Sequence, residues 1–261
     1  MIVRTPDDGS LILINQTDHA KLSGHFAAHW GNELFCLPKD REASIRAAAH
    51  HDHGWLRYEA QPEYDPLTKS TPAFFQTKSS PQTYEAYGWA IDWLTEIDAY
   101  SGLLINRHRT GLYRSRYGAV QQPVSVSRLR NDPMLDEFVA RYEVKQQVAL
   151  ARFSPQQFAV DYQMLQFWDL MSLALCLRDP REETFALVPN SYDGDGTQGV
   201  EIKMVPLPGD RIALDPYPFD VKELQLGYVY RQFPTRDFPD EETFRRAYFG
   251  AAPQLRQFTF V

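Results

Sequence analysis

Hydrophobic residues recur every three or four positions through most of the first two thirds of the chain, which is the spacing of an amphipathic helix. This spacing predicts helices over 16–30, 41–53, 82–97, 100–113, 133–152 and 155–178. Gly31 and Gly54 follow the first two segments and are typical helix stops. The first part of the chain is therefore expected to be a set of packed helices.

From residue 184 onward, short β-favouring runs alternate with Gly, Pro and Asp turns. They predict strands over 185–188, 200–205, 211–215, 223–233 and 257–261, with a short helix over 241–249. Near the N-terminus, 2–4 and 11–14 flank an Asp7-Asp8-Gly9 turn and predict a small hairpin. Such a hairpin is too small to be stable alone, so we expect it to dock on another sheet or on the helices.

These elements favour a mainly α fold of the α+β type, with a helical core, a short N-terminal β-hairpin and a C-terminal antiparallel β appendage. Residues 1–183 are expected to hold the hairpin and the helical core. Residues 184–261 are expected to form a β-rich extension packed on that core as one compact unit. The stretch 55–81 has little periodicity, and a loop of that length is usually functional or wraps around the domain.

Composition narrows the class of protein. The net charge is −7 with no concentrated basic stripe, which argues against binding polymeric nucleic acid but not against a small anionic substrate. No apolar run approaches the length of a membrane span, and the N-terminus carries no signal-peptide core. Cys36 and Cys176 lie far apart without CxxC spacing, which indicates a reducing compartment and no thiolate metal site. A cytoplasmic protein is expected.

Polar residues interrupt the apolar faces of four predicted helices: His19 on the first, His51 and Asp52 at the end of the second, His108 on 100–113, and Asp169 on 155–178. Each falls at helical spacing among apolar residues and is expected to point inward. Buried carboxylates without a partner are costly, and no lysine lies on these faces to neutralise them. One divalent metal held by His19, His51, Asp52 and Asp169 would satisfy all four residues. Taken singly, each residue has another interpretation: a hydrogen-bonded core histidine, an aspartate paired with arginine, or a chance His-Asp pair.

The segment from Ala47 to Gly54, AAAHHDHG, resembles the signature of the HD-domain superfamily of metal-dependent phosphohydrolases. In that superfamily a His on an early helix, a His-Asp doublet and a late-helix Asp bind the metal. The resemblance therefore implies that His19, His51, Asp52 and Asp169 are the ligands. The stretches QTDHAKLSG, HDHGW, FWDLMSL and DPYPF resemble, more closely, an uncharacterised bacterial family that we associate with this fold.

The sequence also departs from the superfamily pattern. Trp55 stands where many members have a lysine, and only His53 and His108 lie between the doublet and the last Asp. A single metal is therefore favoured over a pair. Mn, Fe, Zn, Co and Ni all suit two imidazoles and two carboxylates.

The resemblance implies a metal-dependent hydrolase of a phosphate ester of a small molecule or nucleotide. Asp52 or Asp169 would orient a metal-activated water, and His108 would protonate the leaving group or bind the phosphate. His53, Trp55 and Arg107 are the further candidates for the substrate pocket. Two arginine pairs also lie in this region, Arg107/Arg109 and Arg114/Arg116. They are typical of a solvent-exposed helix face, but one of these residues could reach a phosphate.

Two other functions stay open. One is an iron-dependent oxygenase of the same fold, and the other is a non-catalytic, metal-stabilised binding or sensory module. A catalytic site should lose turnover when His108 is changed, whereas a structural site should not. The sequence leaves the role of the C-terminal sheet open between a cap over the pocket and a contact between two copies in a homodimer.

Overall fold

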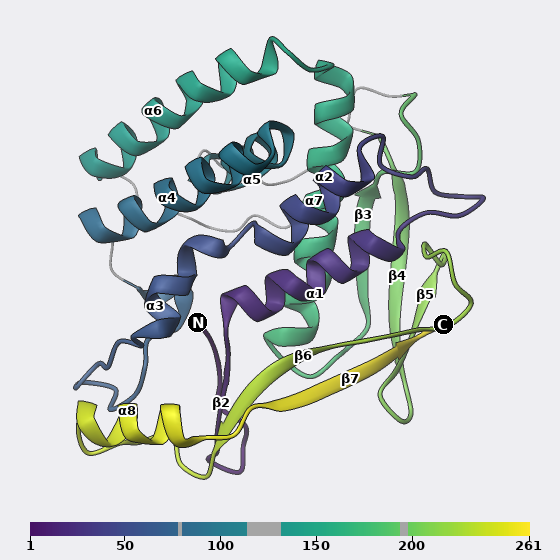
Figure 1. Cartoon of the computed structure of the whole chain (residues 1–261). Helices are drawn as coiled ribbons and strands as arrows, with labels where there is room; N and C mark the ends of the chain where they lie inside the picture. The colour runs from purple at the N-terminus through teal and green to yellow at the C-terminus, as the bar shows by residue number, and fades with distance from the viewer. Residues whose placement is uncertain (78–79, 114–131, 194–197) are drawn as a thin grey trace.

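The computed structural model describes residues 1–77, 80–113, 132–193 and 198–261. Six longer helices match the predicted segments closely: α1 (Gln16–His29), α2 (Arg41–His50), α4 (Pro81–Ile97), α5 (Ala99–Tyr113), α6 (Pro133–Leu150) and α7 (Pro155–Cys176) (Figure 1). The short helix near the C-terminus is α8 (Glu241–Gly250). The 3-10 turn η1 (His53–Trp55) leads into the predicted loop 55–81, which contains the helix α3 (Leu56–Ala60) and the 3-10 turn η2 (Phe74–Gln76).

Capping residues explain why several helices begin where they do. Ser80, Asp132 and Ser154 each accept a hydrogen bond from the first turn of the next helix, and each is followed by proline. Proline has no N–H to leave unsatisfied at that position, so the Ser/Asp-Pro pair is a strong start signal. This local chemistry favours the observed starts of α4, α6 and α7.

The strands form one seven-stranded sheet in the order β1-β2-β6-β7-β5-β4-β3. Their bounds are β1 (Ile2–Arg4), β2 (Leu11–Ile14), β3 (Glu183–Val188), β4 (Val200–Leu207), β5 (Arg211–Asp215), β6 (Leu224–Phe233) and β7 (Gln254–Phe260). The N-terminal hairpin joins through β2, which pairs with β6 so that Leu11 lies opposite Phe233. Neighbouring strands are antiparallel except β5 and β7, which run parallel. The sheet curls around one side of the helices as a half-barrel (Figure 1).

The prediction of a mainly helical, HD-like core with an antiparallel β appendage is wrong. The chain is about half helical and has an α/β fold with a curled mixed sheet. The sheet begins at Ile2 and ends at Phe260, so it belongs to the whole fold. The N-terminal hairpin does dock on another sheet, through the pairing of β2 with β6. Periodicity predicts single elements, but it does not encode the parallel pairing of β5 with β7 that makes the sheet mixed.

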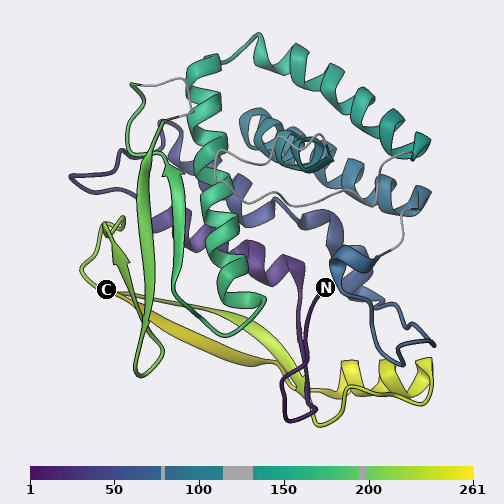
Figure 2. The same ribbon diagram turned by 180° about the vertical axis from the view of Figure 1, so that it is seen from behind.

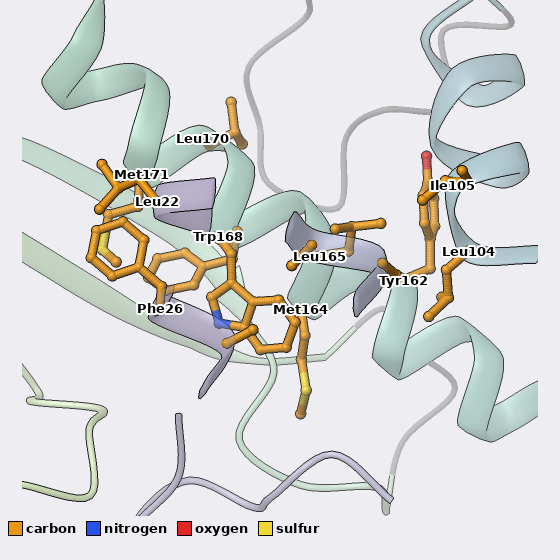
Figure 3. Close-up of a cluster of buried hydrophobic side chains, with 14 of the residues drawn as sticks. Leu22, Phe26, Leu104, Ile105, Tyr162, Met164, Leu165, Trp168, Leu170 and Met171 are labelled. Carbon is orange, nitrogen blue, oxygen red and sulfur yellow. The ribbon is translucent and has the colours of Figure 1, made fainter. Parts of the chain in front are cut away.

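Helix α7 lies at the centre of the hydrophobic core, between α5 and the strands β3–β5 (Figure 2). Leu22 and Phe26 of α1 lie beside Trp168 and Met171 of α7 (Figure 3). The same continuous core includes Phe260 of β7, so helices and sheet share it. Because α7 is buried on nearly all sides, the polar residues that it carries are held in fixed positions. None of the described helices is both long and apolar enough to cross a membrane.

Candidate metal centre and its cavity

A close approach of α1 and α2 brings the first histidines together. Gly24 faces Ala49, and a Cβ added to Gly24 would lie 2.6 Å from the Ala49 Cβ. Only glycine allows the two backbones to pack so closely. As a result the rings of His19 and His51 meet edge to face, with centroids 4.9 Å apart.

The structure brings all four predicted metal ligands into one buried cluster. Nε2 of His19 lies 3.1 Å from Oδ2 of Asp52, and Nε2 of His51 lies 3.2 Å from Oδ1 of Asp169. Oδ2 of Asp52 is also 3.8 Å from Nε2 of His51. All four side chains are at most 8 % exposed. The cluster therefore consists of two carboxylates and two imidazoles that are almost fully buried.

Hydrogen bonds fix how the two histidines present their nitrogens. Nδ1 of His51 donates to the backbone carbonyl of Ala48 at 2.8 Å. The Ser172 hydroxyl donates its one proton to the carbonyl of Asp169, so it accepts from Nδ1 of His19, 2.8 Å away. Both rings therefore direct an Nε2 lone pair toward carboxylate oxygens. That arrangement is repulsive unless a proton or a metal lies between them, and it is how metal-binding histidines are usually held.

The two buried carboxylates of the cluster attract positive charge. Burial disfavours a charged imidazole, yet the Asp169 carboxylate raises the pKa of His51 to about 9. Burial also disfavours charged carboxylates, but Arg109 holds the pKa of Asp52 well below its usual range and His51 lowers the pKa of Asp169 to about 2. Both carboxylates are thus ionised at neutral pH, and without a metal the protonated His51 and Arg109 balance their two charges. A metal bound to Nε2 of His51 would take the place of that proton.

Arg109, on α5, supplies part of that charge. Its guanidinium forms a buried ion pair with Oδ1 of Asp52 and stacks over the ring of Tyr87, 3.9 Å from the centroid. Asp52 therefore faces Arg109 with one oxygen and the histidines with the other. Arg107 was the predicted pocket residue, but Arg109 lines the cavity. Helical spacing does not separate the two, because both follow apolar residues by one helical turn.

His108 lies at the edge of the same cluster. Its ring centroid is 4.8 Å from that of His51, and the side chain is buried. Burial and the neighbouring His51 lower the pKa of His108 to about 3, so the ring is neutral at neutral pH. From this position His108 can hydrogen-bond a molecule bound in the cavity, or it can bind the metal itself through a ring nitrogen.

The residues present fit a divalent metal. The ligand atoms of His19, His51 and Asp169 all lie within 4.8 Å of one another, and so do those of His51, Asp52 and His108. Neighbouring donors that share one metal at about 2.1 Å lie roughly 3.0 to 3.4 Å apart. The closest N–O distances here, 3.1 and 3.2 Å, have that size. The donor set suits Mn, Fe, Co, Ni or Zn.

A cavity of about 350 Å³ leads to the cluster. Asp52, His108, Arg109 and Asp169 line its inner end. Most of the remaining described lining is apolar, and Arg178 and Glu183, which form an ion pair with each other, also line it.

The other predicted pocket residues lie in different places. Trp55 lines the cavity and packs against Phe74. His53 is not among the lining residues but stacks on Trp93, with ring centroids 4.4 Å apart. Arg107 is not among them either, and its guanidinium lies over the ring of Tyr162. Arg114 and Arg116 fall outside the described residues.

Fold and site together define an α/β protein with a buried two-histidine, two-aspartate cluster at the inner end of a cavity. The chain belongs to the family described as Protein of unknown function (DUF3891), whose model matches residues 1–235. This match covers the cluster and most of the sheet, but it does not show membership of the HD-domain superfamily. No curated protein and no solved structure matches the chain.

Proposed function

We propose that this protein is a metal-dependent hydrolase that acts on a phosphate ester of a small molecule. The observation that carries the proposal is the position of the cluster, since Asp52, His108 and Asp169 line the end of a 350 Å³ cavity. Structural metal sites are closed by protein ligands, whereas catalytic sites keep a position open for water or substrate. An accessible cluster therefore supports catalysis over a purely structural role.

The charges at the site support an anionic reacting group. Two ionised carboxylates, the guanidinium of Arg109 and a divalent ion would leave one net positive charge in a buried region. A phosphoryl group would be attracted to such a site, and burial strengthens the attraction. Arg109 lines the cavity and keeps further N–H donors besides those that meet Asp52.

Each residue has a role in this proposal. A divalent metal bound by His19, His51, Asp52 and Asp169 would activate a water and polarise the phosphoryl oxygen. Ser172 and the Ala48 carbonyl hold the two imidazoles in the tautomer that binds. Arg109 orients Asp52 and contacts the phosphoryl group. His108, which is neutral, hydrogen-bonds the attacking water or a phosphoryl oxygen, and its low pKa does not favour the role of proton donor.

A relationship to the HD-domain superfamily is part of this proposal only as far as the ligand set is concerned. The order His, His-Asp, Asp along the chain supports this relationship of the ligand set. The relationship does not extend to the fold.

A cytoplasmic location stays a prediction from the two free cysteines. The oxygenase and the non-catalytic module are the outcomes that a negative test would favour.

The test is release of inorganic phosphate from a panel of phosphate monoesters, measured with added Mn²⁺, Zn²⁺, Fe²⁺ or Co²⁺. We expect turnover that depends on the metal and disappears in an Asp169→Asn variant that remains folded. Absence of release with every metal, from a protein shown to contain the metal, would contradict the hydrolase proposal.

A further inference from the structure

We infer that the cavity selects esters whose non-reacting part is apolar, such as an aryl or short alkyl group, over nucleotides and sugar phosphates. This inference rests on the proposed function and adds the class of substrate. It comes from the polarity of the cavity lining, which is charged at the metal cluster and mostly apolar elsewhere.

On both α7 and α5, a polar residue at the cluster is followed by leucines that line the cavity. On α7, Asp169 lies at the cluster, and Leu173 and Leu177 follow at intervals of four residues on the same side of the helix. On α5, Leu112 follows His108 at the same interval. A ligand whose phosphoryl group lies at the metal, beside Asp169 and His108, would therefore place its remaining atoms between leucines.

Aromatic side chains complete the wall. Trp55, Phe74 and Phe185 line the cavity, and they come from η1, η2 and β3, which lie far apart in sequence. Gln16 is the one amide side chain among the described lining residues. A ribose or a nucleobase would bring several hydroxyl or amino groups against this wall, and each one left without a partner costs free energy.

The charged residues of the cavity do not change this conclusion. Arg109 is paired with Asp52 at the inner end, and Arg178 is paired with Glu183. Neither pair adds an uncompensated charge to the cavity lining. An apolar cavity of about 150 Å³ can hold a benzene ring. The 350 Å³ found here is large enough for one ring and a phosphoryl group.

The experiment uses calorimetry on the full chain supplied with Mn²⁺, with phenylphosphonate and methylphosphonate as ligands that cannot be hydrolysed. We expect phenylphosphonate to bind at least about ten-fold more tightly, because burying one aromatic ring is worth that much. In Leu173→Asn this preference should disappear. The matched control is Val144→Asn, which makes a similar change at an exposed position on α6 and should keep the preference. Leu177→Asn replaces Leu173→Asn if the latter does not fold.

The outcomes separate the two proposals. Equal affinity for the two phosphonates, or tighter binding of adenosine monophosphate than of phenylphosphonate, would overturn the inference and leave the hydrolase proposal standing. If neither phosphonate binds but uncharged phenol does, and binds less well to Leu173→Asn, the apolar cavity is supported and the phosphate chemistry is not.

Discussion

Nε2 of His51 and Oδ1 of Asp169 lie 3.2 Å apart, with side chains that are 0 % and 5 % exposed. One residue follows the end of α2 and the other lies in the middle of α7. Since Nδ1 of His51 already donates to Ala48, the nitrogen that faces Asp169 is the one that must carry a proton or bind a metal. A metal bound between Nε2 of His51 and Oδ1 of Asp169 would fit this contact.

Replacing Ser172 by alanine should weaken metal binding without removing a ligand. The Ser172 hydroxyl accepts the Nδ1 proton of His19 and thereby keeps Nε2 free for the metal. Loss of such a supporting contact typically costs about 10- to 100-fold in affinity. Competition with a chromogenic chelator measures the change. Ser44→Ala is the control, because the buried Ser44 hydroxyl makes no hydrogen bond within the described residues. Equal affinity in wild type and Ser172→Ala would contradict the assigned tautomer.

Replacing Arg109 by methionine should destabilise the metal-free protein. The substitution leaves Asp52 buried without its guanidinium partner, and breaking a buried pair costs about 3–5 kcal/mol. Urea unfolding with chelator and with saturating Mn²⁺ should show that the metal reduces this loss, because it also neutralises Asp52. Arg107→Met, which removes a contact with the ring of Tyr162, should cost about 1 kcal/mol or less. A loss that is the same with and without metal would show that Asp52 does not bind it.

Changes at His108 test whether this residue acts on the substrate. Because burial and His51 keep the ring neutral, its expected contribution is a hydrogen bond rather than proton donation. His108→Ala should lose turnover by about 100-fold, and His108→Gln, which keeps a hydrogen-bonding group, should lose less. Metal content measured on both variants distinguishes this role from ligation. A loss of metal in both would make His108 a ligand.

Glu59 should make stability depend on pH. Its carboxylate accepts from the Thr17 hydroxyl at the start of α1, and burial raises its pKa from 4.5 to about 7. Between these values the folded state holds a proton that the unfolded state has released, so stability falls as pH rises. The loss should reach up to about 3 kcal/mol between about pH 5 and about pH 8. Urea unfolding of Glu59→Gln over the same range should lack this slope. Identical slopes in both proteins would show that Glu59 titrates normally.

The sequence predicted the elements better than their assembly. Helix starts at Pro133 and Pro155 follow from Asp-Pro and Ser-Pro pairs, and each of the seven strands lies at or near its predicted position. The fold class was wrong because the sheet is mixed, which depends on pairings such as the parallel one between β5 and β7. These pairings follow from packing of the whole chain and leave no local signal.

The candidate site was predicted in part for similar reasons. Inward-facing polar residues on apolar helices identified His19, Asp169 and the His51–Asp52 pair, all of which the structure brings into one cluster. Arg107 was predicted for the pocket in place of Arg109, because α5 is buried on nearly every side and periodicity cannot rank its faces. His53 was placed in the pocket by its position beside the doublet, but the turn η1 directs it to Trp93.

The most direct test of the central claim is elemental analysis of protein purified without chelator, alongside Asp169→Asn. Asp161→Asn is the matched control, since Asp161 is a buried aspartate on the same helix that is bound by Tyr100 and Tyr192, away from the cluster. We expect close to one divalent transition metal per chain in wild type and Asp161→Asn, and none in Asp169→Asn. A folded wild type that contains no metal and takes up no added Mn²⁺, Fe²⁺ or Zn²⁺ would contradict the account, and the four residues would then be a buried hydrogen-bond network.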